Sequence, residues 1–210
     1  MGEPVFPQGG LTGVARVFLL RHGATPWNEQ RRIQGRADIE LARDTAASLR
    51  QQRIPAGWLD LPWFTSPQLR CRQTACLLGA ADAAPAGALR EMHWGEFEGL
   101  TLDRVNAEIE RLGLRPGRGL DLLPPGGESP RMVRDRLRRW LLDLPEETGD
   151  LVAVTHKGVI RAALSLATGW DMMSPFPRPV RWQLPHRFEL GPGGAFRLDR
   201  LNCRWREAPR

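Results

Sequence analysis

Two short apolar runs, each followed by a histidine, constrain the fold more than any other feature of the chain. The runs are Val14–Leu20 and Asp150–Thr155; Arg21 and His22 follow the first, and His156 follows the second. Runs of this length and composition are typical of strands buried in a parallel sheet. The carboxyl ends of such strands meet at one edge, beside helix N-termini that favour anions. We therefore expect the two histidines to lie close together at that edge.

Strand and helix patterns alternate through most of the 210 residues. We expect further strands over Leu61–Ser66, Arg181–Leu190 and Phe196–Asn202. We expect helices over Asp44–Gln52, from a Ser66-Pro67 cap to Leu78, over Leu102–Leu112, from a Ser129-Pro130 cap to Leu144, and over Gly158–Thr168. Gly113–Gly127 is rich in Gly and Pro and is expected to be a long loop. The alternation predicts an α/β fold, a three-layer α/β/α sandwich around a mostly parallel sheet. We expect one domain over residues 14–210 after a flexible lead-in over residues 1–13.

Composition excludes several classes of protein. No apolar run reaches the roughly 20 residues that span a bilayer, and the first residues lack the pattern of a secretory signal. The three cysteines do not form a disulfide framework, which favours a cytoplasmic protein with ordinary buried or partly buried thiols. The net charge of +6 attracts anions. No basic and aromatic motif points to nucleic acid, and no cluster of residues has metal-ligand spacing.

Four basic side chains predict a phosphate pocket. Arg21 follows the first strand and Arg70 falls in the first turn of the helix after Leu61–Ser66. A guanidinium group binds phosphate oxygens through two parallel hydrogen bonds. Each of these residues is a weak indication by itself in a chain with 30 Lys and Arg. Together with His22 and His156 they favour an anion site.

Five motifs in order resemble the histidine phosphatase superfamily, which includes phosphoglycerate mutases and phosphatases. They are RHGATPWN (Arg21–Asn28), SPQLRCRQTA (Ser66–Ala75), LREMHWGEFEGL (Leu89–Leu100), GGES (Gly126–Ser129) and VTHKGVIRA (Val154–Ala162). They cover most of residues 14–170. The resemblance implies a phosphoglycerate mutase-like fold.

The resemblance also implies a role for each site residue. His22 attacks phosphorus and becomes phosphohistidine, and Glu91 is the general acid. Arg21, Arg70 and His156 bind the phosphoryl oxygens. Asn28 and Gln34 line the pocket. No metal or other cofactor is required when side chains supply the positive charge.

Glu96 and Glu98 are rivals of Glu91 because they lie in the same motif; Glu98 is expected to be a structural loop residue. The chain departs from the family in two places. About three residues are missing after Leu41, and Lys157 stands where the family commonly has glycine. Both departures border the expected pocket. Lys157, the only lysine, is a candidate for contact with an acidic substrate.

The sequence thus predicts a phosphomonoesterase acting on a small phosphorylated metabolite. The alternatives are a cofactor-dependent phosphoglycerate mutase and an inactive phosphate-binding regulatory module. Mutases of the family are usually longer, and HWGEFEGL resembles the phosphatase branch, so the phosphatase is favoured. The sequence determines neither the ester nor the oligomeric state.

Overall fold

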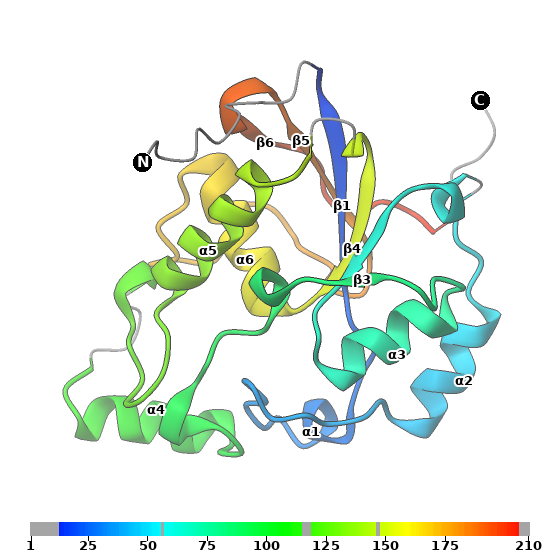
Figure 1. Ribbon diagram of the computed structural model, residues 1–210. Coiled ribbons are helices and arrows are strands. Elements are labelled where there is room, and N and C mark those ends of the chain that lie inside the picture. Colours follow the sequence, from blue (N-terminus) through cyan, green and yellow to red (C-terminus); the bar gives the residue numbers. More distant parts are fainter. Residues whose placement is uncertain (1–12, 56, 115–118, 146–147, 206–210) are drawn as a thin grey trace, which may run out of the picture.

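A six-stranded sheet forms the centre of the computed structural model, which describes residues 13–55, 57–114, 119–145 and 148–205 (Figure 1). The strand order is β3-β2-β4-β1-β5-β6. The strands are β1 (Ala15–Arg21), β2 (Trp63–Thr65), β3 (Ala84–Pro85), β4 (Leu151–Thr155), β5 (His186–Leu190) and β6 (Phe196–Arg200). The strands β1 to β4 pair in parallel, whereas β5 is antiparallel to both β1 and β6. The expectation of a mostly parallel sheet is confirmed.

Helices cover both faces of this sheet. The helices of the described residues are α1 (Pro26–Glu29), α2 (Arg43–Gln51), α3 (Leu69–Leu77), α4 (Leu102–Arg111), α5 (Pro130–Leu142) and α6 (Lys157–Thr168), of which α1 and α4 lie beyond the ends of the strands (Figure 1). The helices α5 and α6 lie on one side and α2 and α3 on the other (Figure 1). The three-layer α/β/α sandwich predicted from the sequence is therefore present.

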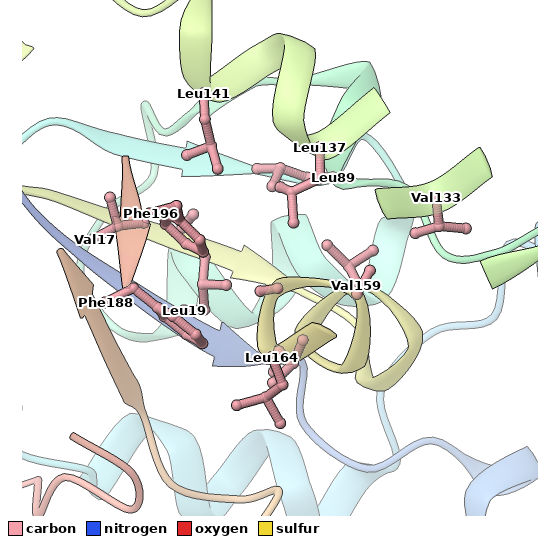
Figure 2. Packing of buried hydrophobic residues seen from close by; sticks show 14 of the residues in the cluster. Val17, Leu19, Leu89, Val133, Leu137, Leu141, Val159, Leu164, Phe188 and Phe196 are labelled. Carbon is pink, nitrogen blue, oxygen red and sulfur yellow. The ribbon is translucent and has the colours of Figure 1, made fainter. Parts of the chain in front are cut away.

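Alternate side chains of β1 build two separate cores, as the period of a strand requires. Val17 and Leu19 pack in the larger cluster, which includes Leu137 of α5 and Val159 of α6 (Figure 2). Phe18 and Leu20 point to the opposite face and pack in the cluster that contains Cys71 and Ala75 of α3. Burial on both faces explains why β1 and β4 are almost continuously apolar.

The register of the sheet brings the carboxyl ends of β1 and β4 together. Arg21 pairs with Thr155, so β1 and β4 end side by side. The backbone N–H of His22 then donates to the Thr155 carbonyl at 2.9 Å. His156 is the N-cap of α6. The neighbouring strand β2 ends at the same edge, where the Ser66 N–H donates to the Val154 carbonyl at 2.9 Å.

Two expected boundaries were wrong. Ser66 does not cap α3, whose N-cap is Gln68. The Ser66 hydroxyl accepts the Gln68 N–H at 3.3 Å and also lies 2.9 Å from Nε2 of His156. The strand expected from Arg181 begins only at His186. A turn closes between Arg181 and Leu184, and Pro185 has no N–H to give to a ladder.

Smaller differences concern segments that the sequence patterns missed. The short elements β3 and α1 were not predicted. Cys76 is exposed, whereas Cys71 and Cys203 are buried as expected. The lead-in over residues 1–13 lies outside the described residues apart from Gly13, and so does part of the expected loop, residues 115–118. Within the described ranges, no helix combines the length and apolarity needed to cross a bilayer.

Candidate active site

A cavity of about 360 Å³ opens at the carboxyl ends of β1 and β4 and the start of α6. Seven of the eight residues expected in the site line it: Arg21, His22, Asn28, Gln34, Arg70, Glu91 and Lys157. His156 does not line the cavity. It is fully buried beside His22, with 5.1 Å between the two ring centroids. The structure thus brings together the two histidines and Arg21, predicted at strand ends, and Arg70, predicted in the first turn of a helix.

One hydrogen bond fixes the tautomer of His22. Its Nδ1 lies 2.7 Å from the Gly23 carbonyl oxygen. A carbonyl oxygen only accepts, so Nδ1 carries the proton and Nε2 of the neutral ring keeps a free lone pair. Burial of the ring, followed by the charges of Arg70 and Arg21, lowers the pKa of His22 well below its ordinary value. The imidazole is therefore neutral and nucleophilic at Nε2 near neutral pH.

His156 is held from behind by two small side chains. Its Nε2 lies 2.9 Å from the Ser66 hydroxyl and 3.3 Å from the Cys71 sulfur. Burial, then His22 and Arg70, lowers the pKa of His156 well below its ordinary value. Because Nε2 faces these partners, the ring is fixed in orientation next to His22.

Backbone carbonyls orient one of the two arginines, Arg70. The Arg70 side chain is completely buried, and its Nη1 and Nη2 donate to the carbonyls of Ala37 and Gly35 at 2.7 and 2.9 Å. The Nε atoms of Arg21 and Arg70 are buried without a hydrogen-bond partner among the described residues. Buried donors of this kind are costly unless an anion uses them, so their presence at one cavity fits a phosphate group.

Glu91 is placed against the N-terminus of α6. Its Oε1 accepts from the Met92 N–H at 2.8 Å and its Oε2 from the Gly158 N–H at 3.2 Å. The Glu91 N–H donates to Gln68 Oε1 at 2.8 Å. Backbone on both sides of the carboxylate therefore fixes it at the cavity wall.

Two arginines outside the prediction hold the backbone of the same segment. Arg36 Nε and Arg136 Nη2 donate to the Glu91 carbonyl at 3.0 and 3.2 Å. Both also pair with Glu128, at 3.1 Å for Arg36 and 3.2 Å for Arg136. Burial alone would raise the pKa of Glu128, but Arg136 and hydrogen bonds to its carboxylate bring that pKa below its ordinary value. The GGES motif thus anchors the segment that carries Glu91.

The rival carboxylates have other surroundings. Glu98 accepts backbone N–H donors from Arg36, Ala37 and Trp94 at 2.8, 3.2 and 3.1 Å. It clamps two loops together, which agrees with the structural role expected for it. Glu96 is exposed and lines no part of the cavity.

Two aromatic residues of the same motif, Trp94 and Phe97, pack in the core. Phe97 is buried with Val105 and Ile109 of α4. Trp94 packs on the same cluster and also lines the cavity. Trp94 therefore forms part of the cavity wall as well as part of the hydrophobic core.

Asn28 and Gln34 enter the cavity from the segment after β1. Asn28 Oδ1 accepts from the Thr25 N–H at 3.0 Å, which completes a capping box at α1. Gln34 is buried, and its Oε1 has no hydrogen-bond partner within the described part of the chain. The shortened loop after Leu41 passes directly into α2, with the Leu41 N–H donating to Gln73 Oε1 at 2.8 Å.

The first turns of α6 supply two further cations, one of them missed by sequence reasoning. Lys157 and Arg161 both line the cavity. The Lys157 Nζ lies 5.1 Å from the ring centroid of Trp182, and the Arg161 Cζ lies 4.8 Å from that of Trp170. Arg161 stands four residues after Lys157, a spacing that places both on one face of a helix. That spacing was the signal available in the sequence.

Among the described residues, no group of three or more His, Cys, Asp or Glu side chains is arranged to hold a metal ion. The cations around the cavity are side chains of arginine and lysine.

Comparisons with known proteins agree with this geometry. Residues 17–203 match the family model of the histidine phosphatase superfamily, branch 1. A protein of Escherichia coli named probable phosphoglycerate mutase GpmB is 32% identical over 162 residues, which cover 73% of this chain and 75% of that protein. We expected mutases of the family to be longer than this chain. The alignment covers similar shares of both proteins, so length does not distinguish this relative from the chain.

Solved structures give the same result. Mycobacterial glucosyl-3-phosphoglycerate phosphatase, in complex with VO3, superposes with a TM-score of 0.70 at 27% identity, over 90% of this chain and 100% of that one. The protein TTHB049 from Thermus thermophilus gives a TM-score of 0.64 at 31% identity, over 90% and 99%. The family resemblance seen in the motifs is confirmed, and the chain belongs to branch 1 of the histidine phosphatase superfamily.

Proposed function

We propose that this protein is a phosphomonoesterase that hydrolyses a small phosphorylated metabolite through a phosphohistidine on His22. The observation that carries the proposal is the state of His22: its Nδ1 proton is engaged by the Gly23 carbonyl and its ring is buried at the cavity. A neutral imidazole with Nε2 free is the form that attacks phosphorus.

In the first step, Nε2 of His22 forms a bond to phosphorus while the ester P–O bond breaks. Glu91 transfers a proton to the leaving oxygen, which departs as an alcohol. Arg21 and Arg70, which line the cavity, bind the phosphoryl oxygens and stabilise charge in the transition state. The unpartnered Nε atoms of both arginines support this assignment. His156 does not line the cavity, so in this proposal it packs against the His22 ring instead of binding the phosphoryl group.

In the second step, the Glu91 carboxylate accepts a proton from water as the water oxygen bonds to phosphorus and the N–P bond breaks. Inorganic phosphate leaves, and Glu91 and His22 return to their starting states. Asn28, Gln34 and Lys157 contact the substrate in this proposal. The positive charge around the phosphoryl group comes from side chains, so no metal ion takes part.

The experiment is to trap the intermediate. Wild-type protein is mixed with a ³²P-labelled phosphate ester, quenched within milliseconds in alkali, and separated from free label. Phosphohistidine survives alkali and is hydrolysed by acid. We expect protein-bound label that is lost on acid treatment and is absent from His22→Ala. Turnover without labelled protein, or label that persists in His22→Ala, would contradict the proposal.

A phosphoglycerate mutase is the second candidate, because the Escherichia coli relative carries that name. The two functions differ in the group that accepts the phosphoryl group from His22. In a phosphatase the acceptor is water, and in a mutase it is a second hydroxyl group of the glycerate. Incubation with a phosphoglycerate, followed by separation of the products, measures this partition. We expect inorganic phosphate to exceed the isomerised ester.

An inactive phosphate-binding module would bind an anion without turnover. The mycobacterial neighbour is described in complex with VO3, and vanadate imitates the phosphoryl group in its transition state. We expect vanadate to inhibit ester hydrolysis by this protein competitively. Binding of vanadate without any hydrolysis would support the regulatory alternative.

A further inference from the structure

Gln68 occupies the cap position of a helix, but its side chain does not cap that helix. It is the N-cap residue of α3, and its amide makes no hydrogen bond to the first turn. Only 6% of the residue is exposed. Burying an amide is costly unless its polar atoms are hydrogen-bonded. The partners of this amide therefore indicate what the side chain does.

Both ends of the Gln68 amide are used, and their partners lie in two different loops. The Nε2 atom donates to the Gly35 carbonyl at 2.9 Å, and Oε1 accepts the Glu91 N–H at 2.8 Å. A carbonyl only accepts and a backbone N–H only donates, so these partners fix the orientation of the amide. Gly35 and Glu91 line the cavity, whereas Gln68 does not. The side chain therefore lies behind the cavity wall and ties two parts of it together.

The Gly35 carbonyl also connects Gln68 to an arginine of the phosphoryl site. Arg70 Nη2 donates to the same oxygen at 2.9 Å, and Arg70 Nη1 donates to the Ala37 carbonyl at 2.7 Å. One oxygen atom thus accepts from the guanidinium group of Arg70 and from the amide that holds the Glu91 backbone. This arrangement fixes the spacing between the Arg70 guanidinium group and the segment that carries Glu91.

The backbone of Glu91 is held on both sides of its Cα atom. Arg36 Nε and Arg136 Nη2 donate to the Glu91 carbonyl at 3.0 and 3.2 Å. Gln68 accepts the N–H on the other side. With both peptide groups fixed, the Glu91 side chain starts from a defined position and direction. Loss of the Gln68 contact would free one of these two anchors.

We propose that Gln68 is a positioning residue for the general acid. It holds Glu91 at the distance from the phosphoryl site that proton transfer to the leaving oxygen requires. It does not touch the substrate and acts through the Glu91 backbone. The inference rests on the proposed phosphatase function and adds a residue to its acid step.

The test removes the amide but keeps its bulk. Gln68→Met fills the same space with an unbranched side chain that makes neither hydrogen bond. We expect kcat/KM on an alkyl phosphate to fall by about ten-fold, near the upper end for one hydrogen bond between neutral groups. The loss on p-nitrophenyl phosphate should stay within about two-fold, because nitrophenolate leaves without a proton. Competitive inhibition by inorganic phosphate should also stay within about two-fold, since Arg21 and Arg70 bind it without proton transfer.

A double-mutant cycle shows whether Gln68 acts through Glu91. In a Glu91→Gln background the proton donor is already absent, so adding Gln68→Met should cost less than about two-fold on the alkyl phosphate. Gln68→Asn keeps the amide but has a shorter arm, so it cannot reach both partners. It provides the same comparison if methionine prevents folding, which circular dichroism and thermal melting detect.

Gln73→Met is the matched control. Gln73 lies on the same helix, and its Oε1 accepts the Leu41 N–H at 2.8 Å. This variant also loses a hydrogen bond between a glutamine side chain and the backbone of a loop, but Glu91 is not in that loop. The ratio of its activities on the two esters should equal that of the wild type.

The outcomes separate the positioning role from the phosphatase function. Hydrolysis of neither ester by the wild type would refute the phosphatase proposal together with its acid step. Equal losses on both esters in Gln68→Met, or no loss, would leave the phosphatase proposal standing and refute the positioning role. An undiminished loss in the Glu91→Gln background would show that Gln68 acts by another route and overturn the assignment. A changed ester ratio in Gln73→Met would also overturn it, because the effect would then belong to α3 in general.

Discussion

Replacing Gly158 with alanine should disable Glu91 while leaving the protein folded. A Cβ atom at Gly158 would lie 2.1 Å from Glu91 Oε1 and 3.1 Å from its Cδ. Going from 2.1 Å to ordinary contact at 3.4 Å requires the carboxylate to move by about 1.3 Å. The clash is with the end of a flexible side chain, so Glu91 yields and the backbone stays in place.

The expected magnitude follows from the displacement. A misplacement of about 1 Å costs on the order of 10²-fold in rate when a reacting group must be aligned. General acid catalysis as a whole contributes about 10²–10⁴-fold. We therefore expect kcat/KM on an alkyl phosphate to fall by about 10²-fold in Gly158→Ala. The loss on p-nitrophenyl phosphate should be much smaller, because nitrophenolate leaves without a proton.

Stability should change little, because weaker hydrogen bonds from the Met92 and Gly158 N–H groups to the displaced carboxylate offset the gain from alanine. Gly158 lies inside α6, and its φ is not in the left-handed region. Alanine in a helix is more favourable than glycine by up to about 1 kcal/mol. A loss of activity without a loss of stability is the signature of a displaced side chain rather than a damaged fold.

The assay compares both esters in wild type, Gly158→Ala and the control Gly87→Ala. A Cβ at Gly87 would meet no atom within 4 Å, so the control changes the same chemical group without displacing anything. Thermal melting is measured for all three proteins. Wild-type activity of Gly158→Ala on the alkyl phosphate would show that the observed position of Glu91 is irrelevant to catalysis.

Three further predictions concern the nucleophile, metals and pH. His22→Ala should abolish turnover of both esters, whereas Glu91→Gln should lower kcat/KM on an alkyl phosphate by about 10²–10⁴-fold and on p-nitrophenyl phosphate by less; equal losses for Glu91→Gln would make Glu91 structural. Hydrolysis should survive EDTA, and complete loss that magnesium restores would refute the role of side-chain cations. Burial lowers the pKa of His186 from its ordinary value of 6.5 to about 4. Between these two pH values the unfolded chain binds a proton at His186 that the folded chain does not bind, so the free energy of unfolding falls as the pH falls. Urea unfolding at pH 7 and pH 5 should show this loss reduced by about 2 kcal/mol in His186→Asn, which keeps an acceptor for the Asn202 N–H; an unchanged loss would mean that His186 titrates normally.

The strand ends were predictable because sheet geometry leaves little freedom there. The apolar runs before His22 and His156 required buried parallel strands, and the pairing of Arg21 with Thr155 then places both histidines at one edge. The layered fold followed from the same alternation. The local sequence pattern was sufficient wherever the length and the spacing of the apolar residues were compatible with a single secondary structure.

Local pattern placed one helix start too early and missed a tertiary contact. Ser66 before Pro67 has the composition of a helix cap, yet α3 begins only after Gln68, and the Ser66 hydroxyl is shared between the Gln68 N–H and His156, a residue far away in sequence. Arg161 was missed for a different reason. Arginine is so abundant in this chain that one more, on a helix, carries little information until the cavity is known.

The choice among the three nearby glutamates shows what only the structure decides. Each could donate a proton by residue type, and motif resemblance alone favoured Glu91. Glu98 is occupied by three backbone N–H donors, and Glu96 lies outside the cavity. Glu91 lines the cavity and lies against Gly158, the one residue type that leaves room for its carboxylate there. The glycine in the motif after His156 therefore leaves room for a carboxylate from another motif, although the two segments are distant in sequence.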